Sequence, residues 1–212
     1  VLNAVDDYYK TCNANVHRGI HTLSDEATVA YEEARSTIAR FIGAVPEELI
    51  FTRNTTESIN ILAQSIGNRL KSGDEVLVSQ MEHHSNLVPW QEACRRTGAE
   101  LKILPITDEG RLDMDQIDRY IGAKTKIVSL THCSNVLGTQ NMLSSAVRSA
   151  HNVGAIVIVD GAQSIAHTSV DVKALGFDFY AFSGHKMYGP MGIGALYGRQ
   201  ELLATMDPIM FG

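Results

Sequence analysis

The sequence has little of what would place it outside the ordinary globular class. Its 212 residues include three cysteines, five prolines and one tryptophan, and 44% of the residues are hydrophobic. No stretch approaches the roughly 20 apolar residues of a membrane span, and no secretory signal pattern opens the chain. We therefore predict no membrane partner. An ordinary apolar fraction at this length favours one large core over a disordered chain.

The cysteines argue against metal and disulfide scaffolds. Cys12, Cys94 and Cys133 stand far apart, and no two of them have C-x-x-C spacing. A structural zinc site or a disulfide framework needs such spacing or paired cysteines. We predict no metal site, and we expect free thiols in a reducing, cytoplasmic compartment.

Positive charge is also scarce. The formal net charge is -6, and the lysines and arginines form no run or stripe. Nucleic-acid binding normally leaves a basic footprint on the sequence. We therefore expect no nucleic-acid partner.

What the sequence does contain is a regular alternation of two patterns. Runs such as "VLVS", "IVSL" and "IVIV" are continuously apolar, as in strands that are buried on both faces. Amphipathic helical segments separate them, which indicates βαβ units and an α/β fold with a mostly parallel seven-stranded sheet and helices on both faces. One of the last strands is expected to run antiparallel, because only a glycine-rich loop separates them. The predicted strands are 49–52, 75–79, 101–106, 126–131, 155–160, 177–183 and 193–197, and the main predicted helices are 25–42, 56–70, 88–97, 113–121 and 143–152.

Ligands of such sheets bind at the carboxyl ends of the strands, so the residues after each strand matter most. Asn54 follows the first strand, and Glu57 three residues later resembles a capping box. Amides and threonine hydroxyls at a helix start can bind phosphate, although a plain helix cap explains the same residues.

Two further strand ends carry weaker signals. His83 and His84 follow the second strand, and Asn135 follows the fourth. Adjacent histidines point in different directions, which disfavours a shared metal ion, whereas one imidazole could stack on a flat cofactor and move protons. Asn135 could simply form a turn.

The last two strand ends are more specific. Asp160 ends a fully apolar strand, where a carboxylate needs a cation or several donors unless it caps a helix. Lys186 lies in "FSGHKMYGPMGIG" among glycines, an unusual setting for a solvated lysine. A phosphate cradle, an imidazole, a carboxylate and an amine at one edge suit pyridoxal 5'-phosphate (PLP). The glycines Gly192 and Gly194 faintly echo a dinucleotide fingerprint, but they lack its strand–helix context.

These motifs resemble a known family. "DGAQS" followed by "FSGHKMYGP" looks like the cofactor signature of class V aminotransferases, which have fold type I. The stretches "VHRGIHTLS", "FTRNTTESIN", "SQMEHHSNLVPWQ" and "HCSNVLGT" resemble the SUF-type, group II cysteine desulfurases. The similarity covers essentially the whole chain.

The resemblance implies a role for each matched residue. Lys186 would form a Schiff base with PLP and act as base and acid at the substrate's α-carbon, while Asp160 would pair with the pyridinium nitrogen. The remaining implied roles are stacking and proton transfer for His83, a bond to the phenolic oxygen for Gln163, phosphate binding for Thr55, Thr56, Ser183 and His185, a place near the substrate for Asn135, and a place near the site at a dimer interface for His21.

The implied reaction converts L-cysteine to L-alanine and leaves an enzyme persulfide. The implied partners are a sulfur-acceptor protein of iron–sulfur cluster assembly and a second copy of the chain in a homodimer. Selenocysteine lyase or another class V enzyme is the alternative within the family. A non-catalytic PLP-binding fragment and a nucleotide-binding domain are alternatives of other classes.

The resemblance also implies a domain assignment. Residues 1–212 would form the PLP-binding large domain, shortened at both ends and without the C-terminal small domain. The persulfide-bearing cysteine and the arginine that binds the substrate carboxylate would lie in that absent region.

Overall fold

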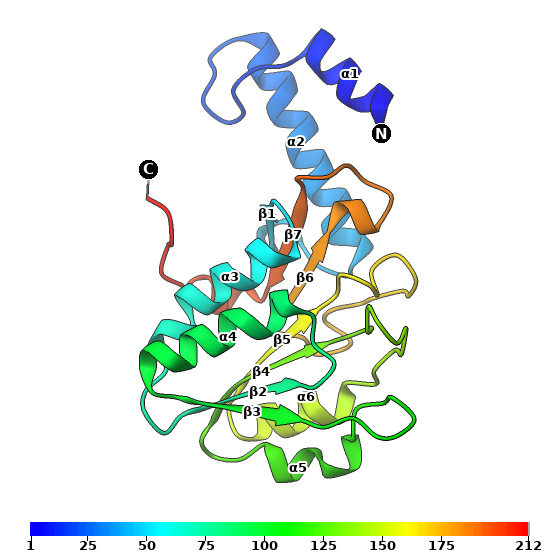
Figure 1. Ribbon diagram of the computed structural model, residues 1–212. Coiled ribbons are helices and arrows are strands. Elements are labelled where there is room, and N and C mark those ends of the chain that lie inside the picture. The colour runs from blue at the N-terminus through cyan, green and yellow to red at the C-terminus, as the bar shows by residue number, and fades with distance from the viewer. Residues whose placement is uncertain (212) are drawn as a thin grey trace.

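The apolar runs form one sheet in the computed structural model, which describes residues 1–211 (Figure 1). Within these residues the strand order is β1-β7-β6-β5-β4-β2-β3. Strands β6, β5, β4, β2 and β3 are mutually parallel, whereas β7 is antiparallel to both of its neighbours, β1 and β6. The strands are β1 (Leu49–Thr52), β2 (Glu75–Ser79), β3 (Glu100–Leu104), β4 (Thr125–Thr131), β5 (Ile156–Asp160), β6 (Phe179–Ser183) and β7 (Gly194–Gly198).

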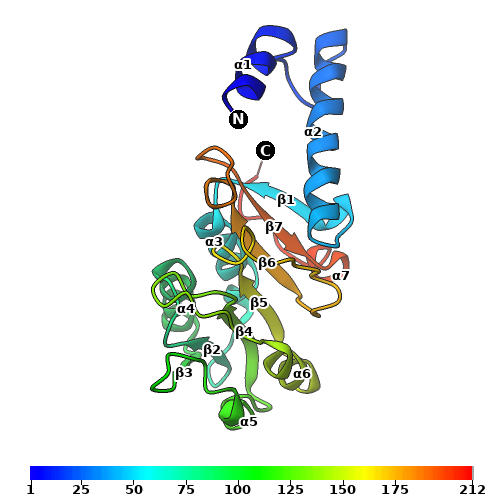
Figure 2. The same cartoon turned by 90° about the vertical axis from the view of Figure 1, so that its right-hand side faces the viewer.

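The central strands are apolar along their length because helices cover both sides of them. Every residue of β2 and β6 is buried, and so is nearly every residue of β5. Figure 2 shows α3 and α4 on one side of the sheet and α2, α6 and α7 on the other. The helices are α1 (Leu2–Thr11), α2 (Thr22–Phe41), α3 (Thr55–Ser65), α4 (His84–Thr97), α5 (Ile117–Tyr120), α6 (Ser144–Asn152) and α7 (Gln200–Leu203).

Two apolar cores result, one on each face. Leu62 of α3 and Trp90 of α4 are both 0% exposed and share a cluster with Val76 of β2. On the opposite face, Ala150 of α6 and Val157 of β5 belong to the second cluster. The predicted α/β fold with a mostly parallel sheet is thereby confirmed, and so is the antiparallel strand near the end.

Several predicted boundaries were wrong. The helix predicted over 56–70 ends at Ser65 and continues as a 3-10 turn from Gly67 to Arg69. Gly67 lies against α4, where a Cβ would come 3.1 Å from that of Ala93, so packing selects the glycine that interrupts the helix. The strand predicted to reach residue 106 ends at Leu104, next to Pro105. The helix predicted over 113–121 divides into a 3-10 turn and the short α5.

The N-terminal segment stands apart from the sheet. No residue of α1 is buried, and the end at which α2 begins projects beyond the strands in both views (Figures 1 and 2). Apolar side chains exposed here include Tyr9 (68%), Ile20 (101%) and Val29 (56%). None of the helices in residues 1–211 combines the length and the apolar composition that crossing a bilayer takes.

Candidate active site

Most of the predicted site residues follow strands that run in the same direction. The loops after β1, β2, β4, β5 and β6 therefore emerge at one edge of the sheet. The register pairs Thr131 of β4 with Asp160 of β5, and Asp160 with Ala181 of β6. The ends of β4 and β5 are consequently level with one another, and β6 continues past them to Ser183.

A direct bond joins the start of α3 to the end of β6. The Ser183 hydroxyl oxygen accepts from the Thr55 amide at 2.8 Å and lies 2.8 Å from the Thr55 hydroxyl oxygen. Both residues are buried, at 3% and 4% exposure. Two residues that lie far apart in the sequence thus meet where the positive end of a helix dipole opens onto the strand ends.

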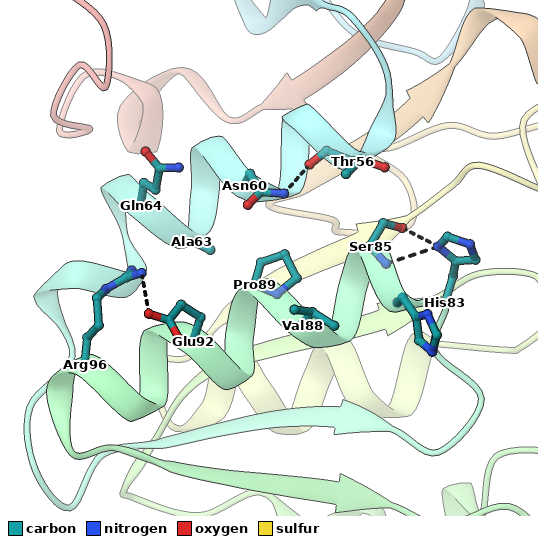
Figure 3. A pocket seen from close by; sticks show the side chains of 11 residues that line it. Thr56, Asn60, Ala63, Gln64, His83, Ser85, Val88, Pro89, Glu92 and Arg96 are labelled. Carbon is teal, nitrogen blue, oxygen red and sulfur yellow. Dashed lines mark hydrogen bonds and ion pairs between the residues drawn. The ribbon is translucent and has the colours of Figure 1, made fainter.

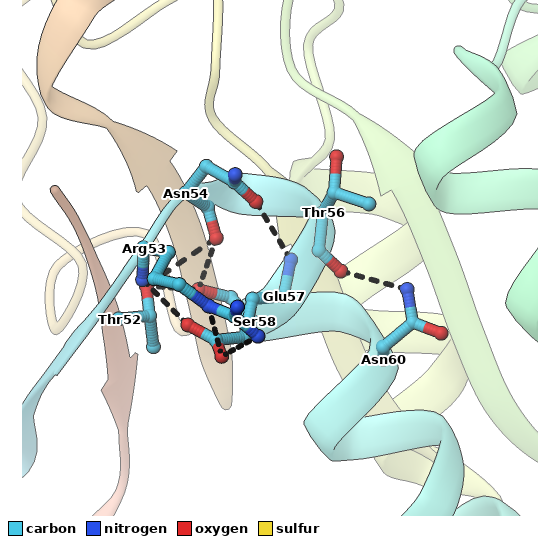
Figure 4. Close-up of polar contacts among 7 residues, drawn as sticks. All are labelled: Thr52, Arg53, Asn54, Thr56, Glu57, Ser58 and Asn60. Atoms are coloured by element: carbon cyan, nitrogen blue, oxygen red, sulfur yellow. Dashed lines mark hydrogen bonds and ion pairs between the residues drawn. The ribbon is translucent and has the colours of Figure 1, made fainter. Parts of the chain in front are cut away.

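The first turn of α3 is capped as the Asn54–Glu57 spacing predicts (Figure 4). Asn54 Oδ1 accepts from the Glu57 amide at 2.9 Å. The Glu57 carboxylate accepts from the Arg53 amide and pairs with the Arg53 side chain at 2.8 Å. The reciprocal bond therefore reaches one residue farther back than in a standard capping box. The cap leaves early amides of the helix without intrahelical partners, as every α-helix does.

Asp160 lies at the centre of the edge with an incomplete set of partners. Its carboxylate is buried, and Oδ1 accepts from the Ala162 amide at 2.9 Å. Within residues 1–211 no donor reaches Oδ2. Burial raises the pKa of Asp160, while the Ala162 hydrogen bond, the positive charge of Lys186 and, when its ring is protonated, that of His83 act to lower it. Gly161, next to Asp160, makes room for Tyr180 and not for a ligand, because a Cβ there would lie 2.0 Å from the Tyr180 ring.

Lys186 ends a tight turn directly after β6. The turn is closed by bonds from the Met187 and Gly189 amides to the Gly184 carbonyl, at 3.0 and 2.8 Å. Lys186 is half-buried, and its charge reaches Asp160 without an ion pair in the described part of the chain.

His83 caps α4 and stands where two pockets meet. Its Nδ1 accepts from the Ser85 amide at 3.1 Å, which fixes Nε2 as the protonated nitrogen of a neutral ring. One pocket lies between α3 and α4 and is lined by His83, Thr56 and Asn60, among others (Figure 3). The other is lined by His83, Glu82 and Asn135. His84 lies 6.1 Å from His83, measured between ring centroids, and within residues 1–211 no group of three potential metal ligands gathers.

The other predicted residues are placed less tightly. Thr56 and Asn135 are exposed and line the two pockets that share His83. Gln163 and His185 follow β5 and β6, and no hydrogen bond in residues 1–211 joins either to another predicted site residue. His21 caps α2 by accepting from the Ser24 amide at 3.3 Å, at the projecting end of that helix. It does not join the others within one chain.

A buried polar cluster behind His83 escaped the sequence analysis. Glu82 accepts hydrogen bonds from three elements, and Asn86 and Ser129 extend the cluster. Burial raises the pKa of Glu82 to about 8. The only hint in the sequence is the i, i+4 spacing of Asn86 and Trp90, which aligns two polar groups on one face of α4 just after Glu82.

Comparison with known proteins agrees with this arrangement. The model of the class V aminotransferase family matches residues 1–212. A probable cysteine desulfurase of Staphylococcus epidermidis is 54% identical over 214 residues, covering 100% of this chain and 52% of the relative. A cysteine desulfurase of Haloferax volcanii is 51% identical over 215 residues, covering 100% of this chain and 50% of the relative.

A solved structure agrees in fold over the same extent. The apo structure of a cysteine desulfurase from Thermococcus onnurineus NA1 matches with a TM-score of 0.95 and 45% identity, over 100% of this chain and 53% of that one. The chain thus spans about half the length of the curated relatives it matches. Its fold is that of the PLP-dependent enzymes of fold type I, and the chain belongs to the class V aminotransferase family.

Proposed function

We propose that the chain is the PLP-binding large domain of a cysteine desulfurase. The observation that carries the proposal is Asp160, a buried carboxylate with one oxygen unpartnered, beside Lys186 at the carboxyl edge of the sheet. Such a carboxylate favours a ligand that brings its own positive charge into a dry site. The protonated ring nitrogen of PLP fits this requirement.

The other residues of the edge also fit that cofactor. Thr55, Thr56, Ser183 and His185 would bind the phosphate with hydroxyl, amide and imidazole donors, aided by the dipole of α3. Gln163 would donate to the phenolic oxygen, and His83 would cover one face of the ring. When bound, PLP supplies an aldehyde that combines with amines and a ring that accepts the electron pair released at a substrate α-carbon.

Three of these residues would then bind or move protons, and a fourth would contact the substrate. Asp160 would keep the proton on the ring nitrogen, because an ionised carboxylate in a buried site strongly favours a facing cation. Lys186 would hold the cofactor through its amine, and in its free form would take the α-proton of the substrate and return it. His83 would handle a second proton, which its neutral ring can accept and its protonated ring can donate. Asn135 would contact the substrate.

The substrate we propose is L-cysteine, in line with the names of the relatives. The overall reaction yields L-alanine and transfers the sulfur atom to an enzyme thiol as a persulfide. We do not assign this thiol to Cys94 or Cys133, because burial raises the pKa of Cys94 to about 11 and also raises that of Cys133. A low-pKa thiol is the better nucleophile, and we assign it to the part of the relatives that this chain does not span.

The proposal extends to partners. A sulfur-acceptor protein would take the persulfide sulfur for iron–sulfur cluster assembly in the cytoplasm. A second copy of the chain would cover the exposed apolar side chains of α1 and α2, in a homodimer that places His21 near the partner's site.

The first test is cofactor binding by the chain itself. PLP is added to the wild-type chain, to Lys186→Ala and to the control Lys126→Ala, whose lysine is exposed. Visible spectra are followed by borohydride reduction and peptide mass mapping. We expect a yellow adduct that reduction fixes on Lys186 in the wild type and control alone. A folded chain that forms no adduct, or forms it at many lysines, contradicts the proposal.

Substrate specificity needs a second test on the loaded chain. NMR in deuterated water follows exchange of the α-protons of cysteine and alanine. Exchange that depends on Lys186 supports a catalytic domain, whereas its absence favours a non-catalytic PLP-binding fragment. Release of alanine and sulfide from cysteine by the full-length enzyme separates a desulfurase from selenocysteine lyase, which would act on selenocysteine alone.

A further inference from the structure

Glu82 is half-buried and accepts hydrogen bonds from three different elements. Its Oε1 accepts from the hydroxyl of Ser79, at the end of β2, and from the amide of Thr131, at the end of β4, at 2.5 and 2.8 Å. Its Oε2 accepts from Nδ2 of Asn86, in the first turn of α4, at 2.7 Å. Within residues 1–211 no cation pairs with this carboxyl group. Three donors on one acceptor therefore join the two strand ends to the helix start.

Asn86 allows only one orientation of its amide in this cluster. Its Oδ1 accepts from the Ser129 hydroxyl at 2.6 Å and from the Trp90 indole at 3.1 Å. Both of those donors are buried, so Nδ2 must be the group that faces Glu82. Asn86 is itself 0% exposed, and its amide cannot turn over without leaving buried donors unpaired.

The cluster lies directly behind the predicted site residues. Glu82 immediately precedes His83, and the bond from Asn86 crosses the stretch that carries the His83 ring. Thr131, which donates to Glu82, is the register partner of Asp160. Glu82, which directly precedes His83 in the chain, thus bonds to the backbone of the residue that pairs with Asp160.

We propose that Glu82 is a positioning residue that fixes His83 and the end of β4 relative to Asp160. This proposal rests on the PLP-binding function proposed above, because a fixed orientation of His83 matters only if a ligand binds beside it. Hydrogen bonds from three elements to one short side chain leave the 79–86 stretch a single arrangement. His83 therefore meets a planar ligand in a fixed orientation, without first having to be ordered by it.

The charged groups around the carboxyl are consistent with a holding role. Asp160, on β5, is the neighbouring charge that acts on Glu82 and raises its pKa along with burial. His83 and Lys186 act on Asp160 instead, and lower its pKa. The charge of Asp160 therefore influences the pKa of Glu82, but it is Asp160 and not Glu82 that faces the positive charges of this edge.

A reciprocal exchange of side chains tests the proposal. Glu82→Gln turns an amide NH2 toward Nδ2 of Asn86, so two donors face each other. Asn86→Asp sets two carboxylates face to face. The double variant Glu82→Gln with Asn86→Asp restores every bond, because the introduced amide donates to the introduced carboxylate. Glu92→Gln is the control, since Glu92 is exposed on the same helix and pairs with arginines.

The readout is amide hydrogen exchange in the cofactor-free chain. The Thr131 and Ser85 amides bond to Glu82 and His83 and report the cluster, while the Val147 amide of α6 reports global opening. We expect each single variant to speed exchange at Thr131 and Ser85 by about tenfold or more, the effect of leaving buried polar groups unpaired. The double variant and the control should return to the wild-type rates. Singles that fail to fold while the double folds support the same coupling.

A second readout concerns the bound cofactor. Visible circular dichroism of added PLP should weaken in both single variants and recover in the double. Singles without effect, or a double as impaired as the worse single, overturn the proposal. If the wild-type chain binds no PLP, the proposed function is wrong. The amide exchange rates of the cofactor-free chain still test whether Glu82 holds His83 and the end of β4 in place.

Discussion

Asp160 ends an apolar strand with a carboxylate that is 3% exposed and has one hydrogen bond from Ala162. Burial raises its pKa, so the folded chain holds this proton more tightly than the unfolded chain does. The ionised form therefore lowers the stability of the cofactor-free fold once the pH exceeds the unfolded pKa, and a bound cation relieves this cost. One residue thus opposes folding and favours ligand binding.

Asp160→Asn separates these two effects. At neutral pH we expect the variant to raise the free energy of unfolding of the cofactor-free chain on the order of 1 kcal/mol, because the buried charge is removed. Its affinity for PLP should fall by about tenfold or more, since the ring nitrogen loses its ionic partner. Urea unfolding with and without PLP measures both quantities. A variant that is less stable without cofactor contradicts this account.

Glu82 gives a pH dependence of known sign. Its pKa rises from 4.5 to about 8 on folding, so between these values the folded state binds a proton that the unfolded state has lost. Stability is then fully present below the lower value and decreases as the pH rises through the upper one. The raised pKa of Asp160 acts in the same direction.

We therefore expect the free energy of unfolding of the wild type to fall as the pH rises from about 4.5 to about 8 and to level off above that, with a shallower slope in Glu82→Gln. Urea unfolding at a series of pH values measures the slope, and Glu92→Gln should retain that of the wild type. Equal slopes in Glu82→Gln and wild type would show that Glu82 does not titrate in this range.

Two residues were conspicuous in the sequence because their chemistry is unusual for their setting. Lys186 among glycines and Asp160 after an apolar strand both stood out, and the structure places both at one edge, close enough for their charges to interact. Glu82 did not stand out, because a glutamate in a polar loop resembles any exposed residue. Its burial arises from packing between β2, β4 and α4, which no local pattern encodes.

At the scale of elements, α3 links the fold to the proposed phosphate site. Asn54 caps the helix, and Thr55 ties its first turn to β6 through Ser183. The cap was predictable from the local spacing of Asn54 and Glu57. The tie to Ser183 was not, since it joins residues from distant parts of the chain, and neither were the element ends that depend on packing, such as Gly67 against Ala93.

Asn54→Ala tests the contribution of the cap. We expect a loss of about 1 kcal/mol in the free energy of unfolding, because the Glu57 amide loses its acceptor. The matched control is Asn60→Ala, an exposed position of the same helix whose side chain bonds only to the Thr56 carbonyl (Figure 4). It should be neutral or slightly stabilising, as alanine is the better helix former. Thermal unfolding measures the stability of both variants, and an equal loss of stability in the two would contradict a stabilising role of the cap.

At the scale of the whole molecule, the projecting α1 and α2 carry exposed apolar side chains within the described residues. The proposed homodimer would cover them. The sequence pattern predicted the helix α2 here but not an uncovered surface, because amphipathic periodicity does not say whether the apolar face meets its own sheet or another chain.

Ile20→Glu probes this surface without touching the core, since Ile20 is 101% exposed. We expect sedimentation equilibrium to show self-association of the wild type that weakens by roughly tenfold or more in the variant, because a charge enters an apolar contact. Ile103→Glu is the control, at a partly exposed position on the edge strand β3. A wild type that stays monomeric, or equal weakening in both variants, would place the contact elsewhere.

The position of β1 has a consequence for how the chain matures. β1 (Leu49–Thr52) pairs only with β7 (Gly194–Gly198) within the described residues, so this edge of the sheet joins two distant segments. On the ribosome, β1 and the start of α3 are made first and must wait for β7. At about 5–20 residues per second, that delay lasts roughly ten seconds or more. Meanwhile an apolar strand lacks its neighbour, and such non-local pairing is slow to form. The proposed phosphate site at the start of α3 therefore takes shape late in synthesis.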